Sequence, residues 1–103
     1  MEKPMPYTYM LQCADGSFYT GWTVDLEARL KAHSGGKGSR YTRSRLPVQL
    51  VYWETNPDRN SALRREAAIR KLRRKEKEKL INYFKNNPEN FLGQNPESGI
   101  KWS

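Results

Sequence analysis

The sequence predicts an α+β domain, in which helices flank a small three-stranded antiparallel sheet in the order β-β-α-β-α-α. Aromatic and apolar residues alternate on both sides of an Asp-Gly turn near the N-terminus, which is typical of a hairpin. A third apolar run follows Pro47, and three other segments repeat apolar residues at helical spacing. We expect residues 1–85 to form this single domain. Residues 86–103, rich in Asn, Pro and Gly, are expected to form a flexible or loosely docked tail.

Each element has its own signal in the sequence. The strands are expected over residues 7–13, 17–22 and 48–54, with Val48, Leu50 and Tyr52 on one face of the third. The helices are expected from a Thr23 cap to about His33, from an Asn60 or Ser61 cap to about Arg73, and over about 75–85. The Gly-rich segment 34–39 ends the first helix and predicts a mobile loop.

The length of the hairpin loop decides whether Tyr9 and Tyr19 share a face of the sheet. A two-residue Asp15-Gly16 loop would place the two tyrosines on opposite faces. A three-residue loop, with Cys13 opposite Ser17, places both on the same face. We predict the three-residue loop or an equivalent bulge, with Gly16 supplying the left-handed residue that it needs.

The chain is strongly basic, and the basic residues are clustered. Its 103 residues carry 19 Lys and Arg against 11 Asp and Glu, a net charge of +8. Residues 59–85 hold 11 of the basic residues and only three acids, and residues 28–53 hold six basic residues and no acid. Such a surface indicates an anionic partner.

The same composition excludes several other classes of protein. No apolar run approaches the ~20 residues of a membrane helix, and the chain is too short for a dinucleotide-binding domain. One His and one Cys exclude a His-rich or Cys-based metal centre and a disulfide framework. We therefore expect a cytoplasmic protein without a membrane partner.

A few residues remain that could support catalysis. Tyr9 and Tyr19 lie on adjacent predicted strands. Arg29 and His33 are four residues apart and share a helix face that adjoins the apolar stripe. Glu66 stands towards the apolar side of an otherwise basic helix. A lone carboxylate in that position, with mostly cationic neighbours, is not expected of a residue that serves only solubility.

These residues resemble the motifs of the GIY-YIG nuclease superfamily, and more narrowly its small stand-alone bacterial members, the uncharacterised UPF0213-like proteins. The resemblance covers about residues 6–81. It rests on the runs Tyr7-Thr8-Tyr9-Met10-Leu11, Phe18-Tyr19-Thr20-Gly21-Trp22 and Asp25-Leu26-Glu27-Ala28-Arg29-Leu30-Lys31-Ala32-His33, followed by Ala62-Leu63-Arg64-Arg65-Glu66. The chain departs from the family pattern at Tyr7, Thr8 and Thr20, which stand at backbone and packing positions.

The resemblance implies a metal-dependent endonuclease that hydrolyses phosphodiester bonds in DNA. It assigns catalytic roles to Tyr9, Tyr19, Arg29 and His33, and makes Glu66 the ligand of Mg²⁺ or Mn²⁺. Either tyrosine could be the base, with Tyr19 slightly favoured, and Arg29 and the metal are expected to lower the pKa of that tyrosine. His33 would orient the tyrosine or the attacking water. DNA structure rather than base sequence is the expected basis of selection.

The basic residues are expected to hold the substrate, which is DNA or, as a second option, RNA. The residues assigned to nucleic-acid binding are Lys37, Arg40, Arg43, Arg65, Arg70, Arg73 and Arg74. Structural readings of the same residues stay open at this point: the tyrosines as packing, Arg29 paired with Asp25, and Glu66 paired with Arg70. Two other functions also stay open, a nucleic-acid-binding module without turnover and a protein-interaction adaptor.

Overall fold

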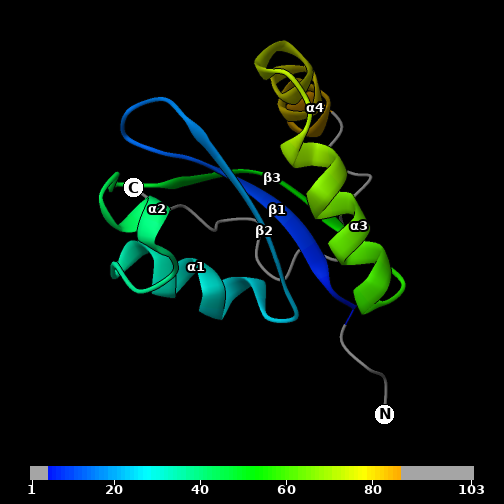
Figure 1. Cartoon of the computed structure of the whole chain (residues 1–103), viewed down its shortest axis with the longest axis horizontal. Helices are drawn as coiled ribbons and strands as arrows, with labels where there is room; N and C mark the ends of the chain where they lie inside the picture. Colours follow the sequence, from blue (N-terminus) through cyan, green and yellow to red (C-terminus); the bar gives the residue numbers. More distant parts are fainter. Residues whose placement is uncertain (1–4, 87–103) are drawn as a thin grey trace.

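The structure, a computed structural model, describes residues 5–86 and has the predicted fold class (Figure 1). Its strands are β1 (Tyr7–Gln12), β2 (Phe18–Thr23) and β3 (Gln49–Thr55), and its helices are α1 (Leu26–Ser34), α2 (Arg40–Arg43), α3 (Arg59–Arg70) and α4 (Arg74–Asn86). The strands form an antiparallel sheet in the order β2-β1-β3. The predicted tail lies outside the described residues except for Asn86, so the domain boundary at residue 85 stays a prediction.

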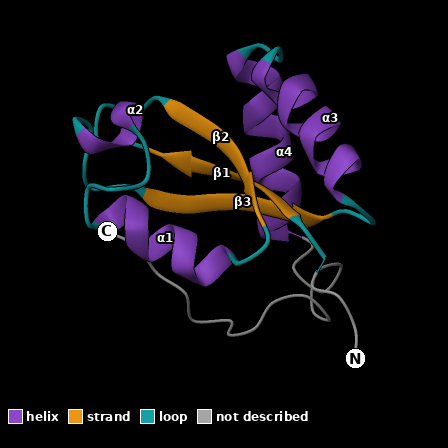
Figure 2. Ribbon diagram, turned by 60° about the horizontal axis from the view of Figure 1, so that its bottom comes forward, coloured by secondary structure: helices purple, strands orange, loops and turns teal. Residues whose placement is uncertain are grey.

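The sheet lies between two groups of helices, with α1 and α2 on one side and α3 and α4 on the other (Figure 2). Burial of apolar side chains on both faces stabilises this arrangement. The first face buries Tyr9, Leu11, Cys13, Leu26, Leu30, Val48 and Trp53, and the second buries Met10, Val51, Tyr52, Ile69 and Ile81. In the part of the chain that the structure describes, no helix has the length and apolarity to cross a membrane.

The predicted hairpin register is confirmed. Leu11 pairs with Tyr19 and Tyr9 pairs with Gly21, which continues to Cys13 opposite Ser17, where the Cys13 N–H donates to the Ser17 carbonyl at 2.8 Å. Gly16 closes the three-residue loop with a φ of +86°, in the left-handed region that favours glycine. Tyr9 and Tyr19 therefore point to the same face of the sheet.

The prediction that Tyr52 shares a face with Val48 and Leu50 is wrong. The pairing of β1 with β3 shifts by one residue, because Met10 pairs with Tyr52 whereas Leu11 pairs with Leu50. This bulge inserts one residue into β3 and turns Tyr52 towards α3 and α4, while Leu50 and Val48 stay on the α1 side.

The helix starts also differ from the prediction. Asp25, rather than Thr23, caps α1 by accepting from the Ala28 N–H, and Asp58, rather than Asn60 or Ser61, caps α3 by accepting from the Ser61 N–H. Aspartate is the stronger choice because its charge also complements the positive end of the helix.

The Gly-rich loop is tied to the end of α1. The N–H of Lys37 donates to the Ala32 carbonyl at 2.8 Å, and the N–H of Gly36 to the His33 carbonyl at 3.0 Å. The loop leads into α2, a four-residue helix that the sequence patterns do not predict, and Ser39 caps it.

Candidate active site

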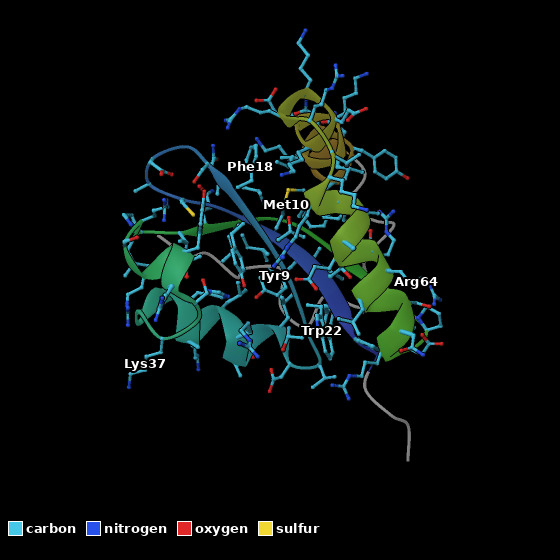
Figure 3. All side chains as sticks on the ribbon, viewed as in Figure 1. Tyr9, Met10, Phe18, Trp22, Lys37 and Arg64 are labelled. Carbon is cyan, nitrogen blue, oxygen red and sulfur yellow. The ribbon has the colours of Figure 1, made fainter. Side chains whose placement is uncertain are left out.

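Tyr9, Tyr19 and His33 form a compact cluster on the α1 side of the sheet. The hydroxyl of Tyr9 lies 2.8 Å from Nε2 of His33, in a buried hydrogen bond between β1 and α1. The ring centroid of Tyr19 lies 5.2 Å from that of His33 and 6.4 Å from that of Tyr9. Figure 3 places Tyr9 at the centre of the molecule, on the middle strand. The three residues that the motifs single out are thus neighbours in space.

The second nitrogen of His33 is also held. Its Nδ1 lies 2.9 Å from Oγ1 of Thr42, and Thr42 Oγ1 in turn donates to the Ser39 carbonyl at 3.4 Å. Oγ1 of Thr42 also lies 3.0 Å from Oγ of Ser39, so both ring nitrogens of His33 have a hydroxyl partner. A hydrogen-bonded chain runs from Tyr9 through His33 and Thr42 to the N-terminus of α2.

Two glycines make room for this chain. A Cβ at Gly21 would lie 2.8 Å from the Tyr9 hydroxyl oxygen, and a Cβ at Gly38 would overlap the ring of His33. Gly38 and Thr42 have no place in the sequence-predicted site. Their roles depend on how the α1–α2 connection folds back over His33, and no local pattern encodes that contact.

Burial sets the protonation of the cluster. It lowers the pKa of His33 to about 4, with a smaller contribution from the positive charge of Arg29, so the imidazole is neutral at pH 7. Burial also raises the pKa of Tyr9 well above its usual 10, and Arg29 offsets this only in part. Arg29 thus acts on the pKa of Tyr9 in the expected direction, but desolvation outweighs its attraction and the net shift is upward.

The lowered pKa of His33 predicts a loss of stability in mild acid. Below the unfolded-state pKa of about 6.5, the unfolded chain binds a proton that the folded chain refuses until about pH 4. The free energy of unfolding should therefore fall, by about 3 kcal/mol at most, as the pH drops from about 6.5 to about 4. Above this range the full contribution of neutral His33 to stability is present. Urea unfolding at pH 7.5 and pH 5 measures the difference.

His33 is the only histidine of the chain, so the effect is easy to assign. The variant His33→Gln should have a flatter stability profile over the same window. A nuclear magnetic resonance titration of the single imidazole checks the cause directly, and a midpoint near 6.5 in the folded protein would contradict it.

Arg29 stands beside the cluster with an uncommitted guanidinium. It is exposed on α1, and among residues 5–86 its side chain has no hydrogen-bond or ion-pair partner. The alternative pairing with Asp25 is not formed, since the Asp25 carboxylate accepts from the Ala28 N–H instead. Arg29 is close enough for its charge to affect the pKa values of both Tyr9 and His33.

Glu66 approaches the cluster from the other side of the sheet. It lies on α3 between the buried Ala62 and Ile69, and its side chain is only 17% exposed. Its charge contributes to the raised pKa of Tyr9. The pairing of Glu66 with Arg70, left open by the sequence, is formed as well, because Arg70 Nη2 lies 3.0 Å from Glu66 Oε2.

A hollow of about 380 Å³ opens at the free edge of β2. It is lined by Phe18, Tyr19, Thr20, Tyr41, Arg70 and Lys77. Since α2 and α3 cover opposite faces of the sheet, a hollow that both line must lie across its edge. Tyr19 joins this hollow to the buried cluster. Tyr41 and Lys77 are absent from the sequence-predicted site, because their positions depend on how α2 and α4 pack.

The predicted substrate-binding residues fall into groups. Lys37, Arg40 and Arg43 are exposed around α2, and Arg73 is exposed at the start of α4. Arg74 pairs with Glu78 at 3.0 Å and reaches the Gly16 carbonyl at 2.9 Å. Arg65 forms two hydrogen bonds, of 2.7 and 3.0 Å, with the Glu54 carboxylate on β3, so its guanidinium is already engaged.

Glu66, beside the cluster, is the residue suited to a hard divalent cation. A carboxylate oxygen is a ligand type that Mg²⁺ prefers, and Mg²⁺ usually keeps several waters and adds substrate phosphate rather than needing a full set of protein ligands. Within the described ranges, no three His, Cys, Asp or Glu side chains gather as a metal site. The donor set therefore fits an ion held by one carboxylate, water and phosphate.

Comparison with known proteins agrees with the motifs. The model of the GIY-YIG catalytic domain family matches residues 5–82. The chain is 48% identical to a UPF0213 protein of Streptococcus sanguinis over 82% of this chain and 93% of that protein. It is 50% identical to a UPF0213 protein of Syntrophus aciditrophicus over 81% and 93% of the two chains.

Two solved structures are similar too. A UPF0213 protein of Bacillus halodurans, solved by nuclear magnetic resonance, is 44% identical with a TM-score of 0.50, covering 76% of this chain and 83% of that one. A protein of E. faecalis, solved in the same way, is 42% identical with a TM-score of 0.55, covering 81% and 88%.

Proposed function

Since the chain belongs to the GIY-YIG catalytic domain family and groups with its UPF0213 proteins, we propose that it is a divalent-metal-dependent endonuclease that hydrolyses DNA phosphodiester bonds. The observation that carries the proposal is the convergence of Tyr9, Tyr19, His33 and Arg29 on one face, within electrostatic reach of Glu66. These five residues come from four elements, and packing alone does not require an uncommitted arginine beside the buried Tyr9.

The two tyrosines take different roles in this proposal. Tyr19 lines the open hollow, where a substrate phosphate and an attacking water have access, so we assign it the role of general base. Tyr9 is 2% exposed, and its hydroxyl is held in a buried hydrogen bond with His33. Tyr9 and His33 therefore act as the rigid support against which Tyr19 packs, rather than as groups that exchange protons with solvent.

Arg29 and the basic surface handle the charge of the substrate. The planar guanidinium of Arg29 suits two oxygens of one phosphate, and it has no partner to give up among the described residues. Lys37, Arg40, Arg43 and Arg73 lie exposed around α2 and at the start of α4, and would contact neighbouring phosphates of the backbone. Such contacts favour selection by DNA structure rather than by base sequence.

Glu66 would hold the Mg²⁺ or Mn²⁺ ion. When bound, the ion would relieve charge on the phosphoryl oxygens and assist the leaving oxygen. Glu66 is well placed for this because it is sheltered from water yet close enough to Tyr9 to affect its pKa. The cytoplasmic location expected from the sequence stays a prediction.

A cleavage panel tests the proposed function. Duplex, single-stranded, flap and junction DNA are incubated with the protein and Mg²⁺ or Mn²⁺, with a chelator as blank. We expect cleavage of at least one form, and a loss of at least ~100-fold for Glu66→Gln with an unchanged unfolding midpoint. The matched control is Glu78→Gln, which removes the acid of the other i,i+4 Arg–Glu pair and should cleave normally.

One observation favours a second function, a nucleic-acid-binding module without turnover. The Glu66 carboxylate already has a cationic partner in Arg70. If that pair is permanent, the protein should bind DNA with a steep salt dependence, a slope of about 0.9 per neutralised phosphate, and cut none of the panel. Cleavage that depends on Glu66 excludes this alternative.

A further inference from the structure

The contact between Arg70 and Glu66 has an unusual setting for a helix ion pair. Arg70 Nη2 lies 3.0 Å from Glu66 Oε2 and also 3.4 Å from the backbone oxygen of Thr20 on β2. One terminal nitrogen therefore ties the carboxylate to the edge strand. Arg70 is 57% exposed and Glu66 only 17%, so the arginine is the more accessible and more easily moved partner.

The Arg74–Glu78 pair on α4 has the same i,i+4 spacing but a more exposed carboxylate. Arg74 and Glu78 on α4 lie equally close, at 3.0 Å, but their side chains are 56% and 48% exposed, as expected of a solvated surface pair. A sheltered carboxylate such as Glu66 loses more hydration, and its attraction to a nearby cation is screened less. The attraction between Arg70 and Glu66 is therefore less weakened by water and salt than that between Arg74 and Glu78.

This pairing conflicts with a cation at Glu66. An ion bound to the carboxylate would lie close to the guanidinium, and two positive groups near one carboxylate repel each other. In the free protein Arg70 thus competes with a divalent ion for Glu66. Binding of the ion requires the guanidinium to turn away and to find another anionic partner.

The hollow at the free edge of β2 is a site where another anionic partner of Arg70 could bind. Arg70 and Lys77 both line it, together with Tyr19, the proposed base. Lys77 has no ion-pair partner within the described part of the chain. A phosphate in the hollow would meet two cations from α3 and α4, and Arg70 could bind it through the forked guanidinium that suits phosphate. Moving onto the phosphate releases Glu66.

We propose that Arg70 makes phosphate binding and divalent-cation binding cooperative: it occupies Glu66 in the free protein, and a substrate phosphate in the hollow draws it away. This inference rests on the proposed function, because it takes Glu66 as the metal-holding residue. It deepens that function by assigning a regulatory role to Arg70. The free protein would hold metal weakly, and the complete site would form only on a phosphate-bearing substrate.

The test measures Mn²⁺ affinity rather than cleavage. Free Mn²⁺ is followed by electron paramagnetic resonance, with and without thymidine 3′,5′-bisphosphate, a probe with two phosphates and no internucleotide bond. A titration of Mn²⁺ with the probe alone corrects for direct chelation. In the unsubstituted protein we expect the probe to tighten Mn²⁺ binding at least about fivefold, and Mn²⁺ to tighten probe binding by the same factor.

The variant Arg70→Gln should separate the two events. We expect it to bind Mn²⁺ at least about fivefold more tightly than the unsubstituted protein without the probe, and to lose most of the probe's effect. The matched control is Arg64→Gln, which removes one charge from the same helix, where Arg64 contacts Ser61 instead of Glu66. Glu66→Gln identifies the binding that belongs to this site.

The outcomes distinguish this inference from the proposed function. If the protein cleaves DNA and binds Mn²⁺ through Glu66, but Arg70→Gln and Arg64→Gln have equal Mn²⁺ affinities, the coupling is overturned and the nuclease stands. If the probe tightens Mn²⁺ binding equally in Arg70→Gln, phosphate acts by direct ligation and Arg70 has no coupling role. If no Mn²⁺ binding depends on Glu66, both proposals fail.

Discussion

Alanine in place of Arg29 should lower the rate of DNA cleavage about 10³-fold and leave the unfolding midpoint unchanged. The large kinetic effect is expected because the guanidinium would stabilise charge that develops on the phosphate in the transition state. The small effect on stability follows from its setting, since Arg29 is exposed and its side chain bonds to no other residue of the described part. Single-turnover cleavage and thermal unfolding measure the two quantities.

Two further variants sharpen this prediction. Arg29→Lys keeps the charge but loses the fork, so it should recover only part of the rate. Lys31→Ala removes a cation from another face of the same helix and should cleave almost normally. Equal losses in Arg29→Ala and Lys31→Ala would mean that Arg29 contributes only to the general positive charge of the surface.

Replacing Tyr19 and Tyr9 one at a time by phenylalanine should distinguish a catalytic tyrosine from a structural one. Tyr19→Phe removes the proposed base and should lower the cleavage rate by about 10²–10⁴-fold with little change in stability. Tyr9→Phe leaves Nε2 of buried His33 without its partner and should cost about 1–3 kcal/mol of folding free energy. Its effect on the rate should stay within about tenfold. Denaturant unfolding and cleavage kinetics on both variants give the comparison.

The opposite ranking would reassign the roles. A larger rate loss in Tyr9→Phe than in Tyr19→Phe would make Tyr9 the base, and would require its raised pKa to be overcome when substrate binds. Tyr83→Phe, a change at a half-exposed tyrosine of α4, is the control for a hydroxyl outside the site.

Local signals were enough to predict most of the fold. The spacing of apolar residues gave three strands and three longer helices, and the position of Gly16 decided the hairpin register correctly. The face of Tyr52 was missed because a bulge between β1 and β3 depends on how two distant strands settle against each other, which no single strand encodes. Four-residue α2 was missed because it is too short to show a period.

The candidate site was predicted less completely than the fold. Motif positions identified Tyr9, Tyr19 and His33, which the structure brings together, and their catalytic roles stay predictions. Thr42 and Gly38 were missed because they act through the loop that folds back over His33. The partner of Arg65 shows a similar limit, since a count of charges does not reveal that Glu54 engages it, whereas the i,i+4 spacing did indicate the pairing of Glu66 with Arg70.

The hairpin loop has a consequence for how such chains can change in length. Surface loops usually accept single insertions and deletions at little cost. The shared face of Tyr9 and Tyr19 depends on the strand pairing, in which Tyr9 lies opposite Gly21 and Leu11 opposite Tyr19. An extra loop residue leaves both tyrosines on this face as long as that pairing is kept, whereas a pairing shifted by one residue would turn Tyr19 away from His33. Length variation at this turn is therefore tolerated only where it leaves the strand pairing unchanged.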